Sequence, residues 1–220
     1  MSLHLCLLNM RLIPQYNFER DPRKHILFLG DIFDGKNDTS LSCIKEQLNT
    51  DYYCFSNFKV RSAAQMEYRI QYFCESEFFT PDLIVSYGSG ATLAAQIKGI
   101  EKVLIRPSYD TSATLKQLLG EKCTKRRIQL PTPVPPEYLT IIPQMIIEWK
   151  QLEAKAFEYG YNADAHSLFL APDIDLPTYS AHIQQFGNSL MLPGENMSDP
   201  IAVEGIVKLI RSCIEAQEQV

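Results

Sequence analysis

Residues that build metal centres and disulfide-stapled domains are sparse in this sequence. The 220 residues include six cysteines and four histidines, with no Cys-x-x-Cys pair and no Cys/His spacing typical of a zinc site. Cys54 and Cys74 fall in apolar runs of the chain. We therefore expect reduced, buried thiols in a cytoplasmic protein, with no metal and no other cofactor.

Positive charge and long apolar runs are also scarce. Lys and Arg number 21 against 26 Asp and Glu, and the one basic cluster, residues 122–127, is typical of a solvated loop. No run is long enough to span a bilayer, and residues 2–13 lack the basic start and the cleavage site of a signal peptide. We therefore expect neither nucleic acid nor a membrane as a partner.

What the chain does contain is an alternation of strands and helices within a composition that is 45% hydrophobic. The patterns predict strands at 25–30, 51–60, 82–87, 102–106, 166–171 and 189–192, and helices at 39–48, 61–78, 91–97, 179–186 and from 200 onward. Such alternation predicts an α/β fold, a mostly parallel sheet with helices on both faces. The length favours a single domain, 1–220, with residues 1–24 as an N-terminal extension.

The alternation is interrupted at residues 121–159. Four prolines between positions 131 and 136 precede a predicted helix, 137–159, which contains Trp149 and is expected to break at Pro143. An insertion at the strand ends commonly covers a site as a lid. An amphipathic helix can equally be stabilised by packing on the sheet, and the sequence leaves both arrangements open.

The chain is organised around residues 82–97. An apolar, β-branched run is followed by Ser86-Tyr-Gly-Ser-Gly90 and then by good helix formers that end before Gly99. A buried strand, a glycine-rich turn and a helix in this order have the shape of a nucleophile elbow, the sharp turn that exposes a catalytic side chain.

Four segments in this order resemble the α/β-hydrolase fold and, within it, the small bacterial esterases of the YqiA-like group. They are residues 26–31, 82–95, 102–118 and 168–210, and together they cover most of 25–212. The resemblance implies a three-layer α/β fold. It also implies hydrolysis of a carboxylic ester or thioester by a serine on the elbow, an aspartate and a histidine.

The elbow of such enzymes requires small residues two positions before and two positions after its tip. With Gly88 at the tip, the flanking residues are Ser86 and Gly90, and both are small. With Ser89 at the tip, one flanking residue would be Tyr87, whose ring does not fit between strand and helix. The resemblance therefore places Gly88 at the nucleophile position, and a glycine has no nucleophile.

The acid of the family falls at Asp173, with Asp175 as the runner-up. Loop aspartates also organise turns and cap helices, so this structural role stays open for both. Beside the oxyanion hole the family usually has His-Gly, whereas this chain has Gly30-Asp31. A carboxylate at that place would oppose the negative charge that develops during acyl transfer.

The histidine of the family should follow the strand at 189–192. No histidine follows His182, and the loop offers Glu195 and Asn196 instead. His182 precedes that strand, and His166 begins a strand at the end opposite the site. Surface or packing roles are expected for both.

These departures predict a pseudoenzyme, inactive as a serine hydrolase, that acts by binding. Loops at strand ends form a crevice whatever residues they carry. The partner would be a small-molecule or acyl ligand, or another protein, and the chain could form a homodimer. The expected pocket is lined by Asp31, Tyr87, Ser89, Tyr109, Asp173 and Asn196.

Two alternatives remain. Ser89 could attack with Asp31, Asp173 or Glu195 as base, which would make the protein an atypical esterase or thioesterase. Gly88-Ser-Gly90 could instead hold a nucleotide phosphate at the helix start. The dinucleotide fingerprint fits poorly, because Leu93 occupies its third small position and the chain has no Walker lysine there.

Overall fold

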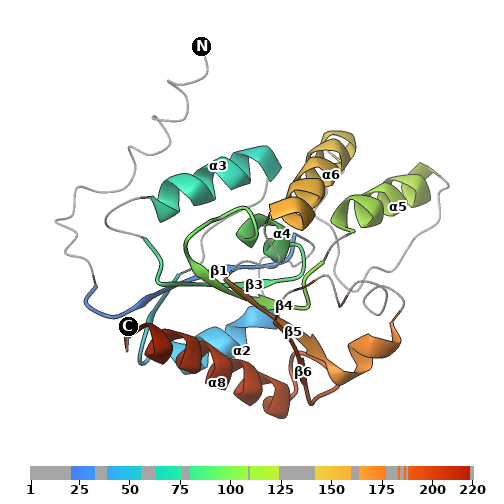
Figure 1. Cartoon of the computed structure of the whole chain (residues 1–220). Helices are drawn as coiled ribbons and strands as arrows, with labels where there is room; N and C mark the ends of the chain where they lie inside the picture. Colours follow the sequence, from blue (N-terminus) through green and yellow to red (C-terminus); the bar gives the residue numbers. More distant parts are fainter. Residues whose placement is uncertain are drawn as a thin grey trace.

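The fold is seen in a computed structural model, which describes residues 21–32, 39–55, 63–75, 80–108, 110–123, 142–159, 164–176, 183, 186 and 188–218. A six-stranded sheet lies between two layers of helices (Figure 1). The strands are β1 (His25–Leu29), β2 (Tyr53–Phe55), β3 (Leu83–Tyr87), β4 (Glu101–Ile105), β5 (Ala165–Leu170) and β6 (Ser189–Leu192). Their order is β2-β1-β3-β4-β5-β6 and every pairing is parallel. The predicted α/β fold is confirmed.

The central strands are apolar on both sides because helices cover both faces of the sheet. All five residues of β1 are buried, as are Leu83, Ile84 and Val85 of β3. In the register, Leu27 pairs with Ile84. This continuous burial is the usual environment of a parallel strand and explains why these runs could be recognised from sequence.

The helices divide into two layers (Figure 1). One layer holds α3 (Ala63–Cys74), α4 (Gly90–Ala94), α5 (Thr111–Cys123) and α6 (Ile142–Tyr159). The other holds α2 (Thr39–Leu48) and α8 (Pro200–Gln217), which contact each other. A short 3-10 helix, η2 (Ala171–Asp175), follows β5. Each layer buries its own apolar cluster against the sheet.

Helix α6 lies in the layer of α3, α4 and α5 and contacts all three. Trp149 is fully buried, and so are Met145, Leu152 and Ala156. Because α6 begins at Ile142, Pro143 lies in its first turn, where a missing N–H breaks no helical hydrogen bond. Residues 142–159 are thus packed in a helix layer, and 124–141 lie outside the described residues.

The helices predicted at 61–78 and 91–97 both end earlier in the structure, the first of them at Cys74. Helix α4 ends at Ala94, not at Ile97 as the helix propensities predicted. The chain turns at Ala95 and Gln96, and the Gln96 side chain donates from Nε2 to the carbonyl of Leu152 in α6 at 3.1 Å. The tertiary packing of α6 therefore overrides the local preference for helix.

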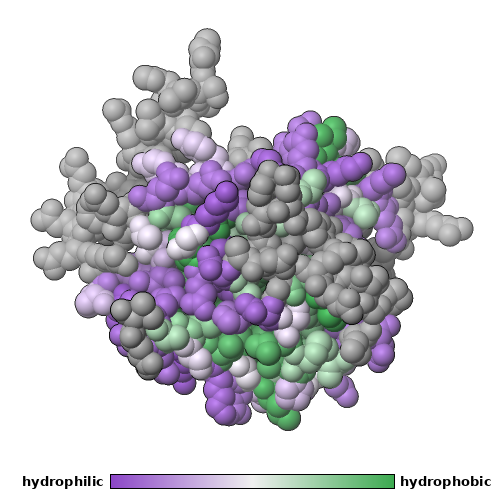
Figure 2. All heavy atoms as spheres, in the orientation of Figure 1, coloured by the Kyte–Doolittle hydropathy of each residue, from purple (hydrophilic) through white to green (hydrophobic). Residues whose placement is uncertain are grey.

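Several predictions fall on residues that the structure does not describe. They concern residues 1–20, 56–62, 76–79 and 177–182, together with Tyr109 and His182. Among the described residues, no helix is long and apolar enough to cross a membrane. In the view of Figure 2, apolar side chains gather over the lower layer, where α8 lies. Ile201 of α8 is exposed, and so are Leu190 and Met191 of β6.

Candidate functional site

The candidate site lies where β1 and β3 end side by side. β1 is followed by α2 in one helix layer, and β3 is followed by α4 in the other layer (Figure 1). In open parallel sheets this reversal of the winding leaves a crevice outside the carboxyl ends of the two strands, where ligands bind. Asp31 follows β1 and Gly88 follows β3, so both lie at this edge.

The turn after β3 has the geometry of a tight elbow. Gly88 adopts a left-handed conformation with φ of +56°. Its carbonyl accepts from the amide of Ala91 at 3.2 Å, which begins the helix directly after the turn. A Cβ at Gly90 would lie 2.4 Å from the carbonyl oxygen of Leu29. The glycine two positions after the tip therefore lets α4 approach β1.

The carboxylate of Asp31 occupies the space that a side chain at the tip would need. A Cβ added to Gly88 would lie 1.9 Å from Asp31 Oδ2 and 2.8 Å from Asp31 Cγ. A carboxylate thus stands where the resemblance to α/β hydrolases would place a nucleophile, and it comes from the loop after β1 rather than from the elbow itself.

Ser89 connects the two loops. Its side chain is fully buried. Its hydroxyl donates to Asp31 Oδ1 at 3.1 Å and accepts from the amide of Ile32 at 2.8 Å. Its amide donates to Asp31 Oδ2 at 3.3 Å.

These bonds engage the two amides that the resemblance to α/β hydrolases would assign to an oxyanion hole. In α/β hydrolases the oxyanion hole is formed by two backbone amides. One belongs to the residue after the tip of the elbow, and the other belongs to a second loop, whose counterpart here is the loop after β1. Here the amides of Ser89 and Ile32 already donate to side chains of the chain itself. A tetrahedral intermediate at this place would have to displace a carboxylate and a hydroxyl.

Asp173, the predicted acid, is held by an arginine. Its carboxylate is buried with 1% of the residue exposed. Arg106 donates from Nη2 to Asp173 Oδ1 at 2.7 Å and from Nε to Oδ2 at 3.0 Å. The amide of Leu170 donates to Oδ2 at 2.8 Å. A buried carboxylate is tolerated when it is paired and hydrogen-bonded in this way, so Asp173 has its charge compensated without a histidine.

Arg106 is the residue of this edge that sequence reasoning missed. It directly follows β4 and has a left-handed backbone with φ of 44°, unusual for a residue with a long side chain. Its amide donates to the carbonyl of Leu168 at 2.7 Å, which continues the pairing of β4 with β5. The signal in the sequence was a lone arginine between an apolar strand and Pro107, but nothing there indicated Asp173 as its partner.

The other predicted site residues are dispersed or lie outside the description. Tyr87 is half-buried and packs against the apolar cluster under α2 and α8. Glu195 and Asn196 are exposed in the loop before α8, where Asn196 Oδ1 accepts from the amide of Ser198 at 2.8 Å. Asp175 is exposed at the end of η2. Tyr109 lies outside the described residues.

The described histidines lie at the other edge of the sheet. His25 begins β1 and is buried, with Nε2 at 3.1 Å from the carbonyl oxygen of Asp21. His166 is the second residue of β5, with Nε2 at 3.0 Å from Glu101 Oε1. Neither side chain can act as a base beside Asp31, because both lie at the amino ends of their strands.

Comparison with known proteins identifies the architecture. The sequence matches no protein-family model and no curated protein. Among solved structures, MGS-M2, an α/β hydrolase enzyme from a Medee basin deep-sea metagenome library, is 14% identical with a TM-score of 0.57 and covers 91% of this chain and 92% of its own. A haloalkane dehalogenase variant from Bradyrhizobium elkanii is 10% identical with a TM-score of 0.57, and the match covers 91% of this chain and 93% of the dehalogenase. Est1E from Butyrivibrio proteoclasticus, solved with ferulic acid, is 14% identical with a TM-score of 0.54, and the match covers 92% of this chain and 93% of Est1E.

Proposed function

Because the chain has the α/β-hydrolase fold, we propose that it is a binding protein built on that fold and is inactive as a serine hydrolase. The observation that carries the proposal is the position of Asp31. Its carboxylate stands where a nucleophilic side chain would project from residue 88, and it accepts a hydrogen bond from the amide of Ser89.

Serine hydrolysis needs a nucleophile, a base and donors for the oxyanion. At the tip there is Gly88, and the amides of Ser89 and Ile32 are engaged by side chains. Removal of one oxyanion donor alone typically lowers kcat by about 100- to 1,000-fold. Loss of the nucleophile costs more still, so these replacements together leave no route for ordinary acyl transfer.

The charge at the carboxyl edge indicates which ligands would bind there. Asp31 is half-buried and acts as an acceptor in its bonds to Ser89. A carboxylate in a partly desolvated place attracts an ammonium or another hydrogen-bond donor and repels an anion. We therefore expect a neutral or cationic small-molecule ligand. Because the fold is shared with esterases, this ligand could also carry an acyl chain.

An atypical esterase or thioesterase remains the second candidate. It is favoured by the 3.1 Å bond between Ser89 Oγ and Asp31 Oδ1, which pairs a hydroxyl with a carboxylate base. Against it, Ser89 is fully buried and its oxygen already accepts from the Ile32 amide. Attack on a substrate would require the turn to open.

Incubation of the full chain with a fluorophosphonate probe should give no covalent adduct by intact-protein mass spectrometry. Short acyl esters and thioesters should likewise be hydrolysed no faster than in buffer, because the tip carries no hydroxyl. The matched control is Ser89→Ala, which should be indistinguishable from the parent in both assays. An adduct that disappears in Ser89→Ala would replace this proposal with the esterase alternative.

The binding part of the proposal predicts a preference by charge. In ligand-observed NMR with matched primary amines and carboxylic acids of equal chain length, we expect the amines to bind more tightly. Asp31→Asn removes the charge and keeps one of the two oxygens that accept from Ser89, and it should weaken amine binding about tenfold, on the order of one charge-assisted hydrogen bond. Equal binding by amines and acids, unchanged in Asp31→Asn, would contradict a ligand site at Asp31.

A further inference from the structure

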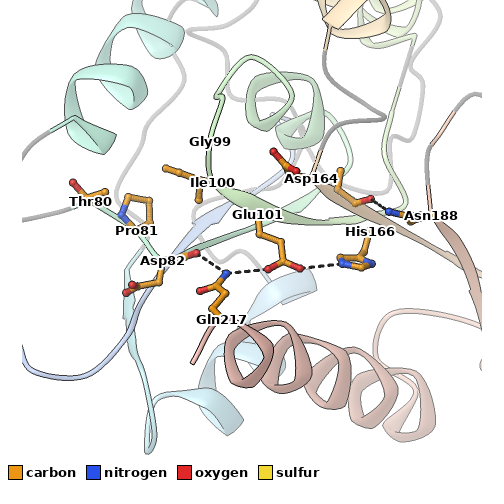
Figure 3. Close-up of a pocket in the computed structure, with 11 residues that line it drawn as sticks. Thr80, Pro81, Asp82, Gly99, Ile100, Glu101, Asp164, His166, Asn188 and Gln217 are labelled. Atoms are coloured by element: carbon orange, nitrogen blue, oxygen red, sulfur yellow. Dashed lines mark hydrogen bonds and ion pairs between the residues drawn. The ribbon is translucent and has the colours of Figure 1, made fainter. Parts of the chain in front are cut away.

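Three side chains with different donor atoms meet at the amino edge of the sheet, opposite Asp31. They are Glu101, the first residue of β4, His166 of β5 and Cys213 of α8. A carboxylate oxygen, a ring nitrogen and the Cys213 Sγ all lie within 4.8 Å of one another. The close-up in Figure 3 shows Glu101 and His166 side by side above α8. This combination of nitrogen, oxygen and sulfur donors is found in transition-metal sites.

The register of the sheet explains how residues so distant in sequence come together. His166 pairs with Val103, two residues after Glu101, so Glu101 and His166 are diagonal neighbours on one face of the sheet. Helix α8 packs on that same face, where it presents Cys213 and, one turn later, Gln217. Three separate elements therefore supply one donor each.

The carboxylate in this cluster is already oriented. Gln217 donates from Nε2 to Glu101 Oε2 at 2.9 Å and to the carbonyl oxygen of Asp82 at 3.2 Å (Figure 3). The other carboxylate oxygen, Oε1, lies 3.0 Å from His166 Nε2. Metal-binding carboxylates are commonly fixed by such a hydrogen bond to a neighbouring amide.

A cavity gives access from solvent to Glu101 and His166, whereas Cys213 is buried and does not line it. The cavity has a volume of about 740 Å³ and is lined by Glu101 and His166 together with Asp82, Asp164 and Asn188. Of the two other carboxylates in its lining, Asp82 pairs with Lys24 at 3.4 Å. The cavity also has room for a water molecule as an additional ligand.

We propose that Glu101, His166 and Cys213 bind a zinc ion whose fourth position is a water molecule in this cavity. Zinc bonds of about 2.0–2.3 Å in a tetrahedron place neighbouring donor atoms about 3.3–3.8 Å apart. Glu101 Oε1 and His166 Nε2 are 3.0 Å apart, slightly closer than this spacing, and because all three donor atoms lie within 4.8 Å of one another no pair has to approach by more than about 1.5 Å. The ion would join the end of α8 to β4 and β5. The proposal is independent of the function proposed for the opposite edge.

Titration of zinc sulfate into the full, untagged chain after removal of metals with EDTA should give one site per chain by calorimetry. Saturating zinc should also raise the thermal unfolding midpoint, because an ion that binds only the folded chain stabilises it. With cobalt in place of zinc, a thiolate-to-metal charge-transfer band should appear in the near ultraviolet.

Cys213→Ala should abolish the cobalt band and weaken zinc binding by more than about 100-fold. Loss of a residue that only hydrogen-bonds to a metal ligand typically weakens metal binding by about 10- to 100-fold, so a larger effect indicates a direct ligand. Cys74→Ala is the matched control, because Cys74 is also a buried thiol but belongs to the other helix layer. If Cys213→Ala fails to fold, Gln217→Ala tests the same site and should weaken zinc binding by about 10- to 100-fold. Absence of zinc binding, or binding that both Cys213→Ala and Gln217→Ala leave unchanged, overturns the proposal.

Discussion

Gly88→Ala will lower the free energy of unfolding by about 3 kcal/mol or more, the sum of a clash and a strained backbone. The added Cβ would lie 1.9 Å from Asp31 Oδ2, and Asp31 cannot withdraw without losing its bonds to Ser89. The φ of +56° adds the cost of holding a side chain in the left-handed region. Urea unfolding measures the effect.

Gly99→Ala separates the two contributions. Gly99 also has a positive φ, +75°, but an added Cβ there has no atom within 4 Å. This variant should therefore lose only the backbone cost of about 1–2 kcal/mol. In a chain that also carries Asp31→Ala, the loss of unfolding free energy caused by Gly88→Ala should decrease to the same level of about 1–2 kcal/mol, the backbone cost alone. An equal loss in Gly88→Ala and Gly99→Ala would mean that Asp31 does not occupy the place of the tip side chain.

Arg106→Met will destabilise the chain by about 3–5 kcal/mol, because it leaves the carboxylate of Asp173 buried without its cation. Asp173→Asn should cost less, about 1–2 kcal/mol, since Arg106 has 24% of its side chain exposed and can reach water. Arg106→Met should consequently cost less in the Asp173→Asn background than in the parent. Urea unfolding of the four chains completes the double-mutant cycle.

An exposed ion pair of nearly the same length provides the comparison. Arg211 Nη2 lies 2.8 Å from Asp51 Oδ2, with 42% and 50% of the two side chains exposed. Arg211→Met should cost about 0–1 kcal/mol, the usual range for surface pairs. If Arg106→Met cost no more than Arg211→Met, the bond between Arg106 and Asp173 would not be what keeps the buried carboxylate in place.

The parts of the fold that the sequence predicted well are those decided by local pattern. The strands around Leu27 and Val85 are continuous apolar runs, and continuous burial in a parallel sheet produces that pattern directly. The elbow could be placed because a tight strand–turn–helix restricts side-chain size at fixed positions. The glycine at 90, whose Cβ would meet backbone oxygen at 2.4 Å, is an instance of this restriction.

The parts that could not be predicted depend on partners far apart in the chain. The sequence singled out Asp173 as the candidate acid but not its arginine partner, which lies 67 residues away and follows a different strand. The cluster of Glu101, His166 and Cys213 has no short spacing, so the sequence indicated no metal site. Helix α4 ended early because α6 binds the side chain of Gln96, a contact that helix propensity does not report.

The arrangement of Gly88 and Asp31 also constrains the order in which mutations can change this protein. A serine introduced at position 88 meets the carboxylate of Asp31, whereas a smaller residue at position 31 removes the obstacle at once. If this protein evolves or is engineered toward a serine hydrolase, a stable intermediate variant therefore requires that position 31 changes first. In a selection experiment for esterase activity, substitutions at Asp31 should precede any at Gly88.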